Sequence, residues 1–202
     1  ITSIPKNTFM NCLELKSVTL PDGLTIIDDS AFAACAKLQH IVIPANVTRM
    51  GKQAFDGCAE LASVTFLGNQ LTSIGAAVDT DSFVFRGTAA LQTIEIPSGV
   101  KFIAKSAFEN SGLVSVTLPS TLEEIGQSAF KNCVNLLEVN IPGSAKNIHK
   151  QAFYNCTGMK NVNIGFVYKI YPPYTGRLYR ALSVAVFLKS KYKLYEVSLT
   201  PQ

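Results

Sequence analysis

A short motif built around one phenylalanine recurs along the chain at a nearly constant interval of about 23 residues, within the range of repeat proteins. In its clearest form an alanine precedes the phenylalanine and a cysteine follows it three positions later, as in Ala54, Phe55 and Cys58. We assign one phenylalanine to each copy: Phe9, Phe32, Phe55, Phe83, Phe108, Phe130 and Phe153. The step from Phe55 to Phe83 is the longest, and it predicts an inserted loop around residues 78–81. One unit of this length cannot bury its apolar side alone, so the period predicts a stack of similar units.

Each unit also contains a segment with the pattern of a short strand. Residues 38–44 read Leu-Gln-His-Ile-Val-Ile-Pro, and similar segments begin at Leu91, Leu113 and Leu136. The alternation predicts a strand with apolar side chains on one face, and proline ends it because it has no N–H for the ladder. Paired strands lie about 4.8 Å apart, which brings successive phenylalanines within the roughly 4.5–7 Å of aromatic contacts. We therefore expect a continuous phenylalanine stack inside a coil of about seven turns.

The complete unit reads Leu-x-x-Ile-x-Ile-Pro-x-x-Val-x-x-Ile-Gly-x-x-Ala-Phe-x-x-Cys and is clearest in residues 38–58 and 113–133. From residue 1 to about residue 164 the chain resembles the BspA-like class of leucine-rich repeats. The resemblance implies a repeat solenoid of the α/β leucine-rich-repeat type. Such a solenoid is a curved right-handed superhelix with short helical turns and a parallel sheet on its concave face. The resemblance also implies a secreted or cell-surface protein of bacteria or some protists that adheres to host matrix or to other cells. The family has no catalytic motif.

Charge and aromatic content divide the chain into two parts. Residues 1–164 hold 12 Lys and Arg against 13 Asp and Glu, whereas residues 165–202 hold six Lys and Arg against Glu196 alone, with six of the seven tyrosines. We expect residues 1–164 to be the solenoid, with a truncated first copy, and residues 165–202 to be a capping segment. A cap is expected because the last turn otherwise leaves a strand edge and a core open. The alternative is that the basic tail binds acidic polymers or a membrane surface.

Composition also argues against some kinds of partner. The repeat region lacks the concentrated positive charge typical of nucleic-acid-binding domains, so we expect no nucleic acid. The sequence contains no apolar run of about 18 residues, so no membrane-spanning helix is expected.

The polar residues of the repeats do not suggest catalysis. The cysteines share one position of the unit, so we expect a buried column of free thiols beside the phenylalanines, and neither disulfides nor a metal site. His40 and His149 belong to distant copies and cannot share a site, so we predict no catalytic residue, no cofactor and no enzyme activity. Asp79 and Asp81 could form a calcium-binding loop, but the further oxygen ligands of an EF-hand are missing, which favours a solvated loop. The five cysteines are Cys12, Cys35, Cys58, Cys133 and Cys156.

The outward positions of the strands form the predicted binding surface. By alternation they make two columns along the concave sheet. Most are small hydroxyl or amide side chains without Trp, Tyr or Arg, which suits a weak, multivalent contact with a protein or glycan, or a merely solvated face. The predicted binding residues are Thr19, His40, Val42, Thr65, Thr93, Glu95, Thr117, Glu138, Asn140, Asn161 and Asn163.

The sequence thus predicts a non-catalytic extracellular module for protein interaction or adhesion, secreted or at the cell surface and monomeric. Two alternatives remain. The repeats could be a structural spacer that presents another domain, or the tail could supply the binding.

Overall fold

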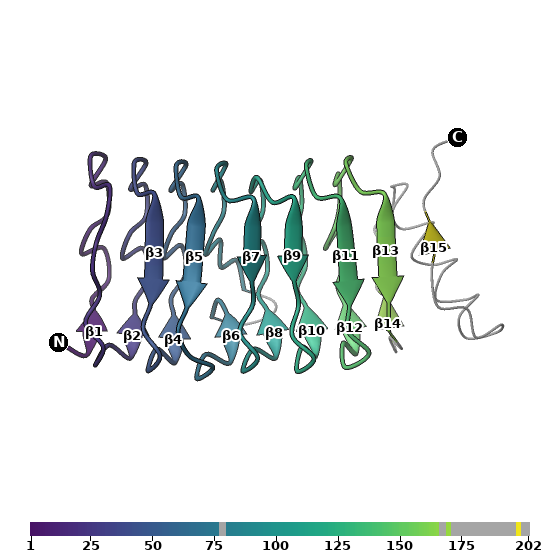
Figure 1. Cartoon of the computed structure of the whole chain (residues 1–202), viewed down its shortest axis with the longest axis horizontal. Coiled ribbons are helices and arrows are strands. Elements are labelled where there is room, and N and C mark those ends of the chain that lie inside the picture. Colours follow the sequence, from purple (N-terminus) through teal and green to yellow (C-terminus); the bar gives the residue numbers. More distant parts are fainter. Residues whose placement is uncertain (77–79, 166–168, 171–196, 199–202) are drawn as a thin grey trace.

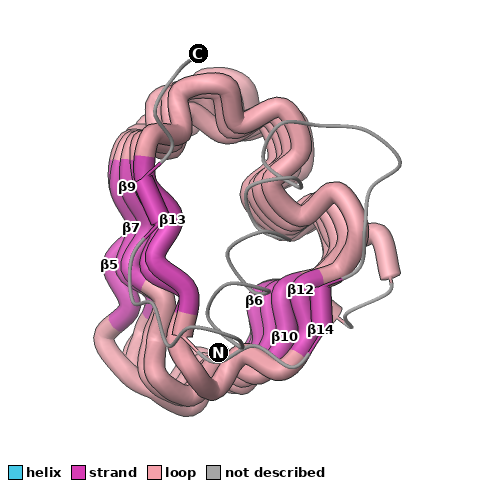
Figure 2. Tube along the Cα trace, turned by 90° about the vertical axis from the view of Figure 1, so that its right-hand side faces the viewer, coloured by secondary structure: helices cyan, strands magenta, loops and turns pink. Residues whose placement is uncertain are grey.

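The computed structural model describes residues 1–76, 80–165, 169–170 and 197–198. Each repeat forms one coil of a solenoid, and the coils stack side by side along the long axis of the molecule (Figure 1). Seen down that axis, every coil follows nearly the same closed path, with strands on two sides (Figure 2). The predicted repeat solenoid of short parallel strands is therefore confirmed.

From residue 40 on, each coil has one long strand on the same side of the solenoid, and these strands run parallel to one another in three separate ladders. Their alternating side chains point inward and outward, so Ile41 and Ile43 are buried while His40 and Val42 are exposed. The register is that of the repeat, with His40 opposite Ser63. The long strands pair as β3–β5, β7–β9 and β11–β13. They are β3 (His40–Ile43), β5 (Ser63–Phe66), β7 (Thr93–Glu95), β9 (Ser115–Thr117), β11 (Glu138–Ile141) and β13 (Asn161–Ile164).

A second set of strands, two residues each, forms parallel ladders on the other side of the coil. In each of these short strands up to β12 the second residue is buried, so one apolar side chain per coil points into the core. The ladders are β1–β2–β4 and β6–β8–β10–β12–β14. These strands are β1 (Ser3–Ile4), β2 (Ile26–Ile27), β4 (Arg49–Met50), β6 (Ser73–Ile74), β8 (Phe102–Ile103), β10 (Glu124–Ile125), β12 (Asn147–Ile148) and β14 (Lys169–Ile170).

The part of the chain before each long strand contains no helix among the described residues, so the expected short helical turns are wrong. Alternate backbone N–H groups there bond to the next coil instead of to their own. Phe32 N–H donates to Ala54 O at 2.8 Å, whereas Ala33 N–H donates to Ser30 O of its own coil at 3.2 Å. Residues two positions before and after the column phenylalanine also have positive φ, as at Ser30 (54°) and Ala34 (58°). Left-handed residues at this spacing interrupt any right-handed helix.

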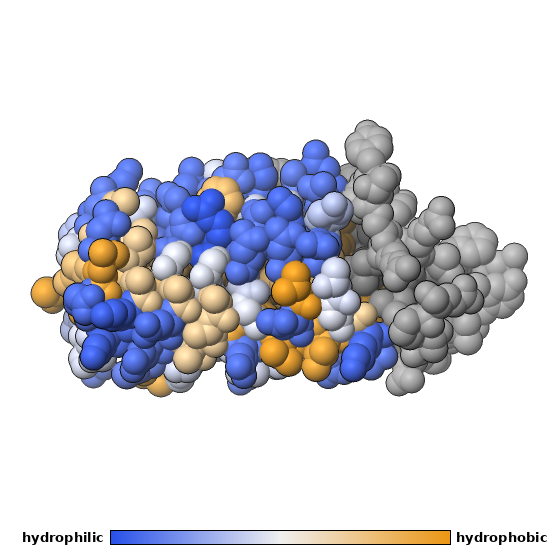
Figure 3. Space-filling model, turned by 90° about the horizontal axis from the view of Figure 1, so that it is seen from above, coloured by the Kyte–Doolittle hydropathy of each residue, from blue (hydrophilic) through white to orange (hydrophobic). Residues whose placement is uncertain are grey.

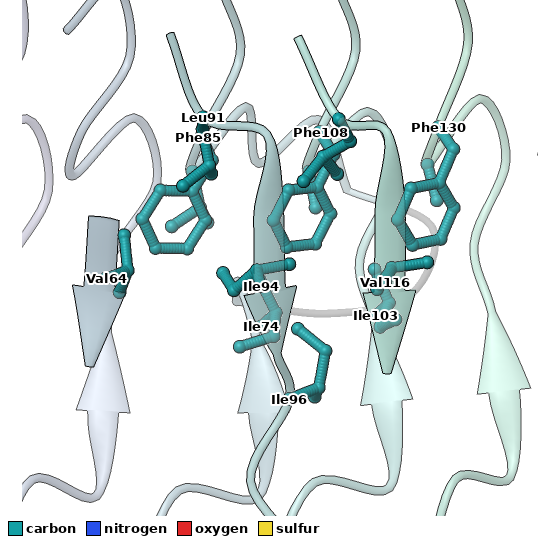
Figure 4. Packing of buried hydrophobic residues seen from close by; sticks show 14 of the residues in the cluster. Val64, Ile74, Phe85, Leu91, Ile94, Ile96, Ile103, Phe108, Val116 and Phe130 are labelled. Carbon is teal, nitrogen blue, oxygen red and sulfur yellow. The ribbon is translucent and has the colours of Figure 1, made fainter. Parts of the chain in front are cut away.

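The phenylalanines form a continuous stack through the core. Six successive ring pairs have centroids 5.1–5.4 Å apart and planes within 14° of parallel. Figure 4 shows three of these rings in a row, Phe85, Phe108 and Phe130, with Ile94 of β7 and Ile96, which follows that strand, below them. The stack is Phe9, Phe32, Phe55, Phe85, Phe108, Phe130 and Phe153.

The fourth member of the stack is Phe85, so the assignment of Phe83 to this column is wrong. Phe83 occupies the left-handed position two residues earlier, with φ of 48°, and the Arg86 guanidinium lies 4.1 Å from its ring centroid. The long step of the column therefore runs from Phe55 to Phe85, and Thr88 takes the position of the cysteine. The insertion is therefore longer than the sequence predicted. The prediction was wrong because the Ser82-Phe83 pair resembles the Ala-Phe motif of the other coils but does not occupy its place in the stack.

The C-terminal side of the solenoid gains two further strands. β14 continues the short-strand ladder by pairing with β12, and β15 (Val197–Ser198) pairs antiparallel with β13. The rest of residues 166–202 lies outside the described residues, so the predicted capping segment and its basic side chains stay a prediction.

Candidate binding surface

The outward side chains of the long strands, together with the preceding Thr19, form what we call the long-strand face. All the predicted binding residues lie on it. They are exposed, except for Asn163, which is half-buried. Their outward orientation follows from the strands themselves, because a strand places alternate residues on opposite faces.

Two of the predicted residues bond to each other. Asn163 Nδ2 donates to Asn140 Oδ1 at 2.7 Å, across the β11–β13 pair. This contact uses amide groups that a ligand would otherwise meet, so the strongest polar groups left on the face are the carboxylates of Glu95 and Glu138. Neither forms an ion pair within the described part of the chain.

A depression of about 530 Å³ opens on this face between β5 and β7. These neighbouring strands are not joined by a ladder in the described structure, because β5 pairs with β3 and β7 pairs with β9. Two predicted residues, Thr65 and Glu95, line the depression together with a loop that follows β5. Its lining residues are Val64, Thr65, Phe66, Leu67, Gly68, Asn69, Glu95, Pro97 and Ser98.

Leu67 is the residue that the sequence interpretation missed. It occupies the position at which proline ends the strand in most other coils, and it is 60% exposed. The loop from Leu67 to Gln70 is also one residue longer than the corresponding loop from Pro44 to Asn46. The lost proline and the extra residue are both visible in the sequence, and they could have marked this coil as different.

The opposite edge of the solenoid, where the chain enters the long strands, is seen in Figure 3. Hydrophilic side chains cover most of this edge, with small apolar groups near the N-terminal coils and among the later coils (Figure 3). The connecting segments here include the exposed side chains of Leu13, Val134 and Leu137.

Ion pairs connect neighbouring coils around the outside of the solenoid, and each joins an acid to a base of the following coil. Arg86 contacts Asp56 with both ends of its guanidinium, with Nε 2.8 Å from Oδ1. Lys105 Nζ lies 3.0 Å from Asp81 Oδ1, so the carboxylate of this loop residue is already paired with a cation. Asp79, the other acid of this loop, lies outside the described residues, among which no group of three potential metal ligands occurs.

The histidines lie on different sides of the coil. His40 is exposed on the long-strand face, whereas His149 follows the short strand β12, with Nε2 3.2 Å from Glu124 Oε2. The two histidines therefore do not share a site, and this agrees with the prediction from their spacing in the sequence.

The cysteines belong to the core. All five are free, and only Cys12 is partly exposed. Cys58 Sγ donates to Phe32 O at 3.1 Å, and Cys35, Cys133 and Cys156 make the same bond to the preceding coil. Burial raises the pKa of Cys58 to about 12 and those of Cys35 and Cys133 to about 11. Protonated, inward thiols of this kind are structural and poorly nucleophilic.

Coils that each contribute one long parallel strand, with inward Leu and Ile at fixed spacing, define a leucine-rich-repeat solenoid. The model of the BspA type leucine rich repeat region matches residues 1–78 and 79–171, with six copies. The chain belongs to this family, and the resemblance inferred from its repeat unit is confirmed. No curated protein matches the chain.

Solved structures share the fold. A leucine-rich-repeat protein of T. pallidum is 24% identical with a TM-score of 0.68, and the match covers 81% of this chain and 77% of that one. A leucine-rich-repeat protein from Bacteroides ovatus is 23% identical with a TM-score of 0.53, over 73% of this chain and 43% of that one. The pneumococcal vaccine antigen PcpA is 20% identical with a TM-score of 0.53, over 85% of this chain and 56% of that one. At these identities the comparisons show the fold alone.

Among the described residues no helix has the length and apolar character needed to cross a membrane.

Proposed function

We propose that this protein is a non-catalytic interaction or adhesion module that binds a protein or glycan through its long-strand face. The observation that carries the proposal is the depression between β5 and β7, where Thr65 and Glu95 meet the exposed Leu67. Binding sites combine apolar surface with a few converging polar groups, and this combination occurs here on an otherwise flat polar sheet.

The construction of the solenoid favours binding on a surface that is already formed. Backbone bonds, ion pairs and the phenylalanine stack connect every coil to the next, so little conformational entropy remains to be lost when a ligand binds. The face around the depression is polar and lacks large aromatic anchors, which favours a modest affinity per contact. Useful binding would then come from several contacts along the solenoid or from several copies.

We further propose that the protein acts outside the cell, secreted or at the surface, as a monomer. The family resemblance of the repeat unit supports this location, and a solved structure with the same fold is a pneumococcal vaccine antigen. The strands of the described coils pair with those of neighbouring coils in the same chain, and this pairing supports a monomer.

The test is binding of the whole chain to immobilised matrix proteins and to a glycan array. A Glu95→Lys, Glu138→Lys double variant reverses the charge of the face, and a matched Asp22→Lys, Glu60→Lys variant changes two exposed acids outside it. We expect the first variant to lose binding and the second to retain it. No binding by any form would favour a structural spacer.

The tail alternative has its own control. If binding survives in the double variant of the face and disappears when Lys189, Lys191 and Lys193 are replaced by Gln, the tail binds the ligand. These three residues lie outside the described structure.

A further inference from the structure

We propose that the depression between β5 and β7 receives a lysine or arginine side chain from an extended segment of a partner protein. The inference rests on the proposed function, since it specifies what the long-strand face recognises. It is carried by the shape and lining of the depression and by the charge that the solenoid leaves unpaired there.

One wall of the depression suits the aliphatic part of a basic side chain. Leu67 is 60% exposed, and the half-buried Phe66 and the buried Pro97 also line the depression. The carbon chain of lysine or arginine packs against such a surface while its charged end stays in contact with polar groups. Leu67 takes the place of a strand-ending proline, so its exposure is particular to this coil.

The other wall supplies an uncompensated negative charge. Most acidic side chains of the described residues pair with a basic residue of the following coil, as Glu14 does with Lys37 and Glu123 with Lys146. One coil after Glu95, the same position holds Thr117, which has no charge. The carboxylate of Glu95 therefore remains available, and a cation from outside the chain is its complement.

The surrounding polar groups suit the main chain of an extended peptide. The hydroxyl groups of Thr65 and Ser98 line the depression, and each can both donate and accept a hydrogen bond. Glu138, the second unpaired acid on the face, lies two coils further along. Two coils of about 4.8 Å and an offset of two strand residues, about 7 Å, give a separation of about 12 Å, or roughly three to four residues of extended peptide. A segment with two basic residues at that spacing matches both carboxylates.

The experiment is an NMR titration of the whole isotope-labelled chain with short Gly/Ser peptides that carry two lysines four positions apart. Matched peptides carry norleucine, glutamine or glutamate in place of lysine. We expect the amide signals of Thr65, Leu67, Glu95 and Ser98 to shift with the lysine peptide, and the apparent affinity to fall as salt is added.

The variants isolate the charge and the apolar wall. Glu95→Gln should weaken the lysine peptide at least fivefold and Leu67→Ser about threefold. Glu60→Gln, which removes another exposed acid outside the depression, should leave the affinity unchanged. Thermal unfolding of each variant checks that the fold is intact.

The inference is overturned if the norleucine or glutamine peptide binds as tightly as the lysine peptide, if the shifts lie elsewhere, or if no peptide binds. If peptides fail while a matrix protein or glycan still binds and is lost in the Glu95→Lys, Glu138→Lys variant, the proposed function stands and only the occupant is wrong. If nothing binds to the long-strand face, both fail.

Discussion

Replacing Phe85 with alanine should destabilise the protein far more than replacing Phe83. Phe85 is fully buried and stacks between Phe55 and Phe108, with centroid distances of 5.4 and 5.3 Å. Phe83 is partly exposed and contacts the guanidinium of Arg86. The two residues are separated by one position, so the comparison tests which of them belongs to the core.

The expected magnitude follows from the contacts that are lost. Burying a phenylalanine side chain contributes about 1.5–3 kcal/mol, and each of the two ring contacts adds about 0.5–1.5 kcal/mol. Phe85→Ala should therefore lower the free energy of unfolding by about 3–5 kcal/mol, the usual range for such a truncation. Phe83→Ala loses one exposed cation–π contact and should cost about 1 kcal/mol or less.

Urea unfolding followed by circular dichroism measures both values, and thermal unfolding gives a second reading. For a chain of this size about 3–5 kcal/mol corresponds to a decrease in Tm of roughly 6–20 °C. Phe9→Ala is a further control, because Phe9 has a ring neighbour on one side and is partly exposed. Equal losses for Phe83→Ala and Phe85→Ala, or a larger loss for Phe83→Ala, would refute the assignment of the stack.

Three further predictions concern the thiols, the left-handed positions and the ion pairs. The buried thiols have a pKa above their unfolded value of 9.0, so the unfolded state loses protons first as pH rises. The free energy of unfolding should then fall between about pH 9 and pH 11 in the native protein, and less steeply in a variant with alanine at the four buried cysteines. Ala34→Gly should stabilise the protein by about 0.5–1 kcal/mol because φ is 58°, and Gly57→Ala, at the equivalent position with φ of 71°, should destabilise it. An unchanged Tm in both variants would show that a non-glycine residue is not strained at this position. Asp56→Asn removes one partner of a largely buried double contact with Arg86 and should lower the free energy of urea unfolding by about 1–2 kcal/mol. Glu14→Gln, at an exposed ion pair, should lower it by less than about 0.5 kcal/mol. Similar losses in the two variants would show that burial does not determine how much these ion pairs contribute to stability.

The sequence by itself determined the repeat, the inward columns and the outward face. Each of these depends on side-chain type at a fixed spacing, and stacking repeats the same environment in every coil. Cys58 and Cys133, for example, meet the same core although they belong to coils that are not neighbours. The alternation of strand residues placed Ile41 inward and His40 outward without any tertiary information.

Only the tertiary structure decided where the pattern breaks. Phe83 and Phe85 both fit the local motif. Which of them enters the stack depends on the number of residues in the insertion that precedes it. The helical turns failed for a similar reason, because backbone groups near Phe32 bond to the neighbouring coil, a partner in the next repeat that local propensity does not include. The depression at Leu67 forms because one longer loop lies beside a coil of ordinary length, and its lining comes from two coils at once.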